Sequence, residues 1–103
     1  MNFPKDLKYS ASHEWARIEG KTATIGVTHF AQDSLGDVVL IDVPAAGTEV
    51  KQFSKFGEIE SVKAVSDLLS PVGGKVVEIN AEAKSNPELV NKDPYGKGWL
   101  IKV

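Results

Sequence analysis

Residues 56–69 have the sequence FGEIESVKAVSDLL, in which two runs typical of β-strands flank a short turn. We expect strands over residues 56–61 and 65–69, with Val62, Lys63 and Ala64 between them. The sequence is nearly palindromic about Lys63, because valine and alanine flank it and serine and valine come next. A lysine in a tight turn is by itself a common surface residue. A symmetric hairpin that projects one lysine would nevertheless let a modifying enzyme select that side chain among the chain's eleven lysines.

Outside this hairpin, apolar residues also recur mostly at every second position, in short stretches separated by Gly, Pro and Asn. Residues 15–18 and 22–27 predict a second hairpin, because Gly20 can adopt the positive φ that a tight turn needs. The β-branched run 38–43 predicts a core strand that ends at Pro44. These stretches indicate a mainly β fold.

Two short helical turns are expected among the strands. The Thr28 hydroxyl can cap a turn over residues 31–35, and Gly36 can end it. Asn86 can cap a second turn over residues 87–90, since proline is tolerated at the first helical position.

The C-terminal part of the chain predicts two more strands, over residues 75–80 and 99–103, with a loop over 92–98 between them. No low-complexity linker divides the sequence, and 103 residues suit one domain. We therefore expect a single domain over residues 1–103.

The composition argues against several classes of partner. The formal charge is −2, Arg17 is the only arginine and the lysines are scattered, so nucleic acid is not an expected partner. No apolar run approaches the roughly 20 residues that span a bilayer, so no membrane association is expected. The absence of cysteine removes disulfides, thiolate nucleophiles and cysteine metal sites. We expect no metal site.

Catalytic constellations are equally weak. The chain has two histidines, His13 and His29, and no Gly-x-Ser-x-Gly motif, so a Ser–His–Asp site is not indicated. Glu58 and Glu60 would share one face of a strand, but a solvated face explains them better than an acid–base pair. The residues favour a protein that is not an enzyme.

The sequence resembles the glycine cleavage system H protein family almost from end to end. The matching segments are LKY (7–9), SHEW (12–15), ATIGVT (23–28), AQ (31–32), LGDVV (35–39), ESVKA (60–64), SD (66–67), SPV (70–72), NPELVN (86–91), DPYG (93–96) and GWLIK (98–102).

This resemblance implies a barrel-sandwich hybrid, or hammerhead, fold of the lipoyl and biotinyl carriers, with lipoate bound to Lys63 through an amide. Biotin carriers place Met on both sides of the modified lysine, and lipoyl domains of 2-oxoacid dehydrogenases usually have Asp-Lys-Ala. Here Val62 and Ala64 flank Lys63, which favours the H protein.

The family also implies partners. Its lipoyl arm shuttles the aminomethyl group from glycine decarboxylase (P protein) to aminomethyltransferase (T protein), and electrons to dihydrolipoamide dehydrogenase (L protein). Lipoylating enzymes attach the arm. By analogy, we expect Ser12, Glu14 and Asp67 to line a cleft that receives the loaded arm, where a carboxylate can pair with a protonated amine.

Family members usually continue past the GWLIK strand, so we expect the domain to lack the usual C-terminal helical segment. We expect a monomer in the bacterial cytoplasm rather than the mitochondrial matrix. Two alternatives remain open: a lipoyl relay protein for 2-oxoacid dehydrogenases, and an unmodified docking module that keeps the fold.

Overall fold

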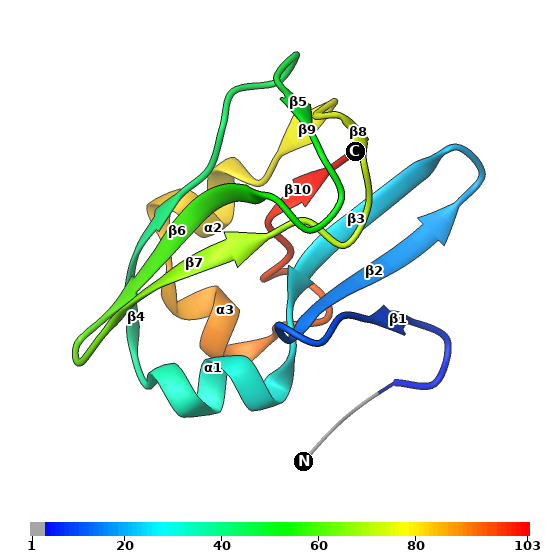
Figure 1. Ribbon diagram of the computed structural model, residues 1–103. Coiled ribbons are helices and arrows are strands. Elements are labelled where there is room, and N and C mark those ends of the chain that lie inside the picture. Colours follow the sequence, from blue (N-terminus) through cyan, green and yellow to red (C-terminus); the bar gives the residue numbers. More distant parts are fainter. Residues whose placement is uncertain (1–3) are drawn as a thin grey trace.

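The computed structural model describes residues 4–103, which form short strands and three short helices (Figure 1). The strands are β1 (Lys8–Tyr9), β2 (Glu14–Glu19), β3 (Thr22–Val27), β4 (Val38–Asp42), β5 (Glu49–Val50), β6 (Lys55–Ser61), β7 (Val65–Leu69), β8 (Gly74–Lys75), β9 (Glu78–Ile79) and β10 (Ile101–Lys102). The helices are α1 (His29–Leu35), α2 (Ala81–Ser85) and α3 (Glu88–Lys92).

The strands pair in three antiparallel sheets. The largest has the order β1-β2-β3-β10-β9, the second β4-β6-β7, and β5 pairs with β8. The prediction of a mainly β fold with short helical turns is confirmed. The described strands divide among separate sheets, so the barrel-sandwich is a sandwich of sheets and not one closed barrel.

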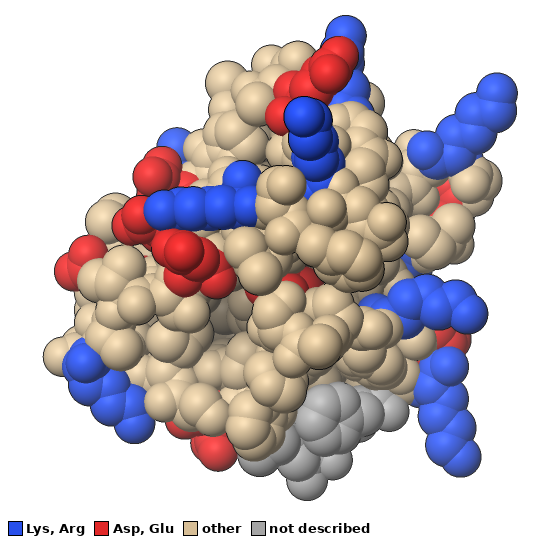
Figure 2. Space-filling model, in the orientation of Figure 1, with Lys and Arg blue, Asp and Glu red and all other residues tan. Residues whose placement is uncertain are grey.

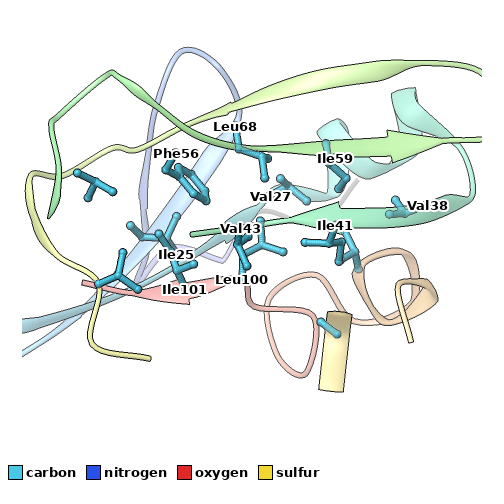
Figure 3. Close-up of a cluster of buried hydrophobic side chains, with 14 residues drawn as sticks. Ile25, Val27, Val38, Ile41, Val43, Phe56, Ile59, Leu68, Leu100 and Ile101 are labelled. Atoms are coloured by element: carbon cyan, nitrogen blue, oxygen red, sulfur yellow. The ribbon is translucent and has the colours of Figure 1, made fainter. Parts of the chain in front are cut away.

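The core lies between the two larger sheets. Ile25 and Val27 of β3 face Ile59 of β6 and Leu68 of β7, and all four are at most 2% exposed (Figure 3). Burial of such side chains stabilises the fold by about 1.5–3 kcal/mol each. The β6–β7 hairpin is therefore anchored by its apolar face, while its tip reaches the edge of the molecule (Figure 1).

Both predicted hairpins and the first helix are confirmed. β2 pairs with β3 through a turn in which Gly20 has φ +62°, and β6 pairs with β7. The Thr28 side chain accepts a hydrogen bond from the Ala31 N–H at the start of α1, and Gly36 ends the helix with φ +81°. These features depend on neighbouring residues, which explains why the sequence predicts them.

The predicted strand over residues 75–80 is wrong in extent. The segment changes its strand-pairing partner near its centre, because β8 pairs with β5 whereas β9 pairs with β10. Between them, the buried Val76 donates its N–H to Thr48 O (2.8 Å), and Val77 donates to Lys102 O (2.8 Å). The strand is split because its two halves find hydrogen-bond partners in different sheets.

The C-terminal elements also differ from expectation. The assigned strand β10 covers only Ile101–Lys102 of the predicted 99–103. A helical turn follows Asn86 as predicted, but Pro87 stands at the N-cap of α3 and no side chain caps it. The helix α2 was not predicted; Asn80 is its N-cap, and the Asn80 side chain accepts a hydrogen bond from the Ala83 N–H.

Gly57 of β6 lies against the backbone at the end of β4. A Cβ at Gly57 would overlap the Asp42 carbonyl oxygen and lie 3.3 Å from the Val43 Cα. Backbone atoms cannot rotate away as a side chain can, so any larger residue must push the two strands apart.

We predict that Gly57→Ala lowers the free energy of unfolding by about 3 kcal/mol, because it overpacks a backbone contact. Urea denaturation measures the loss. Gly73→Ala is the matched control, because a Cβ there would meet its nearest atom, Gln52 N, at 3.4 Å. Its effect should stay within about 0.5 kcal/mol, and equal losses in both variants would contradict the steric explanation.

Candidate functional site

Lys63 occupies the tip of the β6–β7 hairpin, as the sequence predicted. The Ser61 hydroxyl oxygen accepts hydrogen bonds from the Ala64 N–H (3.1 Å) and the Lys63 N–H (3.3 Å). The Ser61 N–H donates to Ala64 O (2.8 Å), which closes the turn. The turn is thus held by backbone groups and one buried serine, while Val62 and Lys63 remain exposed.

The Lys63 amine also differs from its neighbour Lys55 in its charge environment. Lys55 Nζ lies 2.6 Å from Glu58 Oε1 and 3.2 Å from Asp67 Oδ1, and these hydrogen bonds raise the pKa of Lys55. Among the described residues, no carboxylate lies within ion-pair distance of Lys63. Lys63 is exposed and forms no ion pair within residues 4–103, which suits a site of covalent attachment.

Glu14 is a buried carboxylate at the start of β2, only 2% exposed. Its Oε1 accepts hydrogen bonds from the hydroxyls of Ser10 (2.7 Å) and Ser12 (2.5 Å). The loop before it is tight: the Ser10 N–H donates to Glu14 O (2.9 Å), and His13 has φ +68°. Such left-handed backbone is uncommon for a residue other than glycine.

The other Glu14 oxygen connects the two larger sheets. Oε2 accepts a hydrogen bond from the Leu69 N–H (3.1 Å) at the end of β7. The carboxylate therefore ties β2 to the strand that leads away from the Lys63 turn. A charged acceptor makes such a bond stronger than one between neutral groups.

Asp67 is exposed on β7 and lies opposite Glu58 in the β6–β7 ladder. Its carboxylate pairs with Lys55, and no hydrogen bond joins it to Ser12 or Glu14 in the described residues. The structure thus brings Ser12 and Glu14 together and places Asp67 two residues before Leu69. Ser10 was not predicted from the sequence, although the Ser10-x-Ser12-x-Glu14 alternation could have indicated it. The Leu69 amide was not predicted either, because no side-chain pattern indicates it.

An apolar groove of about 400 Å³ lies between β1, β2 and the loops at residues 52–53 and 71–72, and Ser10 is one of its lining residues. Lys63, Ser12, Glu14 and Asp67 do not line it. On the face seen in Figure 2, basic and acidic side chains are interspersed. Within residues 4–103 there is no His, Asp and Glu cluster suited to a metal, and no helix long and apolar enough to cross a membrane.

The model of the glycine cleavage H-protein family matches residues 7–103 of the sequence. The chain belongs to this family. H proteins are carriers, and the role of this one is that of a lipoyl carrier in the glycine cleavage system, as its sequence predicted.

Individual H proteins are similar over nearly the whole chain. The glycine cleavage system H protein of Symbiobacterium thermophilum is 57% identical over 102 residues, which cover 99% of this chain and 80% of that protein. That of Bacillus subtilis is 52% identical over 103 residues and 81% of its length. The crystal structure of the Mycobacterium marinum H protein matches with a TM-score of 0.94 at 39% identity, over 98% of this chain and 84% of that one.

Glu14→Gln in this H protein should lower the free energy of unfolding by about 1–3 kcal/mol, because an amide at this buried position leaves one of the three donors without its charged acceptor. Asp67→Asn is the matched control, since its exposed ion pair contributes at most about 1 kcal/mol. Urea denaturation of both variants measures the difference. A smaller loss for Glu14→Gln than for Asp67→Asn would show that the Glu14 network does not stabilise the fold.

Proposed function

We propose that Lys63 carries lipoate in amide linkage and presents it to the enzymes of the glycine cleavage system. The observation that carries this proposal is the exposed Lys63, free of ion pairs among the described residues, at the tip of a hydrogen-bonded hairpin. It stands in the ESVKA segment on which the family resemblance depends. When attached, lipoate supplies a disulfide that can accept a one-carbon amine and two electrons.

The protein itself supplies a fixed point of attachment from which the lipoyl arm reaches the partner enzymes. A group on a flexible arm reaches each partner at the high effective concentration that a tether provides. The hairpin keeps the point of attachment fixed, because β6 and β7 bury Ile59 and Leu68 at 1% exposure. We expect no catalysis by the chain's own residues, since the partner enzymes supply the active sites.

The partners we propose are glycine decarboxylase, aminomethyltransferase, dihydrolipoamide dehydrogenase and a lipoylating enzyme. Each must approach the hairpin tip, so a monomer with an uncovered tip suits the role. The proposed compartment is the bacterial cytoplasm, because the H proteins to which the chain is similar come from bacteria.

Attachment can be tested directly by incubating the chain with lipoate, ATP and a lipoate–protein ligase. We expect a gain of one lipoyl group, which peptide mass spectrometry should locate on Lys63. Lys63→Arg should gain none, because a guanidinium does not form this amide. Lys55→Arg, the matched control on the same hairpin, should be modified as the parent protein is.

A folded parent protein that gains no lipoyl group would overturn the carrier role and favour an unmodified docking module. If a modified protein supported a 2-oxoacid dehydrogenase and failed with glycine decarboxylase, it would instead favour the relay alternative. Circular dichroism of the same samples establishes that they are folded.

We further propose that Ser12, Glu14 and Asp67 form the polar side of a cleft for the loaded arm. A carboxylate offers about four acceptor positions, and the donors Ser10, Ser12 and Leu69 occupy three of those on Glu14. One position on Oε2 is left for a protonated amine, and the exposed Asp67 adds a second negative charge nearby on β7.

Loading of the lipoylated protein by glycine decarboxylase and glycine should therefore shift the amide resonances of Ser12 and Leu69 in ¹H–¹⁵N spectra. Lys63→Arg treated in the same way is the control, and its spectrum should not change. Shifts confined to the hairpin turn would contradict the cleft.

A further inference from the structure

The turn that bears Lys63 rests on the segment between α1 and β4. The Val62 N–H donates a hydrogen bond to Asp37 O (3.0 Å), a contact outside the β6–β7 ladder. This bond docks the tip of the hairpin onto residues 36–38. The position of the Asp37 carbonyl therefore helps to set the position of the turn.

Asn91 of α3 holds residues 36–38 from both sides. Its Oδ1 accepts a hydrogen bond from the Val38 N–H (2.9 Å), and its Nδ2 donates to Gly36 O (2.8 Å). Nδ2 also donates to Gln32 Oε1 on α1 (3.0 Å). One side chain thus fixes the residues before and after Asp37 and ties them to two helices.

Gly36 leaves space for the Lys63 side chain. A Cβ at Gly36 would lie 3.2 Å from Lys63 Cε and 3.8 Å from Nζ, and the residue has φ +81°. Both the backbone conformation and the contact favour glycine here. The segment that Asn91 clamps is therefore the one against which the Lys63 side chain lies.

We propose that Asn91 is a positioning residue for the modification of Lys63. It acts through the 36–38 segment, which holds the turn by the Asp37 carbonyl and receives the lysine stem at Gly36. This inference rests on the proposed attachment of lipoate to Lys63. Without this support, only a fraction of the molecules has the turn geometry that the ligase recognises. The apparent KM then rises in inverse proportion to that fraction.

Asn80 provides a matched control. Its Nδ2 donates to Lys97 O (2.8 Å) and Trp99 O (2.7 Å), and its Oδ1 accepts from the Ala83 N–H (3.2 Å). Like Asn91, it accepts one hydrogen bond from a backbone N–H and donates two, but it fixes the loop before β10 and not the 36–38 segment. Asn80→Ala and Asn91→Ala should lose comparable stability, and only Asn91→Ala should affect the turn.

The experiment compares lipoylation kinetics of the parent protein, Asn91→Ala and Asn80→Ala with a lipoate–protein ligase, at a temperature where circular dichroism shows all three folded. We expect Asn91→Ala to raise the KM for the protein substrate roughly three- to tenfold, with kcat little changed, and Asn80→Ala to stay within about twofold of the parent. Equal changes in both variants, or none in Asn91→Ala, would overturn the proposal.

Amide hydrogen exchange at Val62 provides a second readout that does not need the ligase. Exchange should become faster in Asn91→Ala and stay unchanged in Asn80→Ala, and unchanged Val62 protection in both would also overturn the proposal. If Asn91→Ala does not fold, Asn91→Asp replaces it, since it keeps the acceptor for Val38 and loses the donors to Gly36 and Gln32. If the parent is not lipoylated while Val62 exchange responds as expected, the failure lies in the proposed function and not in the positioning role.

Discussion

The burial of apolar side chains of β6 and β7 in the core is the constraint on which the site depends. Ile59 and Leu68 face the core at 1% exposure, opposite Ile25 and Val27 of β3. A shift of one residue in either strand would turn the apolar set toward solvent, so burial fixes the register strongly. The position of Lys63 at the tip follows from that register, because the turn is what remains between two anchored strands.

Apolar packing alone does not place the loops around this hairpin. Polar side chains that are buried or half-buried do so: Glu14 joins β2 to Leu69, Asn91 holds residues 36–38, and Asn80 holds the chain before β10. No buried side-chain nitrogen or oxygen of the described residues lacks a hydrogen-bond partner. Because an unsatisfied buried group costs about 1–3 kcal/mol, these networks favour one loop arrangement over others.

The sequence predicted the features that depend on neighbouring residues. The Gly20 turn, the Thr28 cap and the Lys63 hairpin each follow from a few adjacent positions. The split of residues 75–80 could not be predicted in this way, because it depends on partners at Thr48 and Lys102. Glu14 was proposed as a cleft residue by analogy, but its bond to Leu69 joins positions 55 residues apart, which residue spacing does not indicate.

The Lys63 turn is held by hydrogen bonds to its backbone and not by its exposed side chains. Val62 and Val65 are 69% and 58% exposed, so their side chains add little to the geometry of the turn. The Ser61 hydroxyl and the Asp37 carbonyl bond to the backbone of the turn instead, and Asn91 holds the 36–38 segment to which Asp37 belongs. This arrangement leaves the residues beside Lys63 free to contact several different enzymes, because recognition and rigidity depend on separate groups. A carrier that must fit more than one active site gains from that separation.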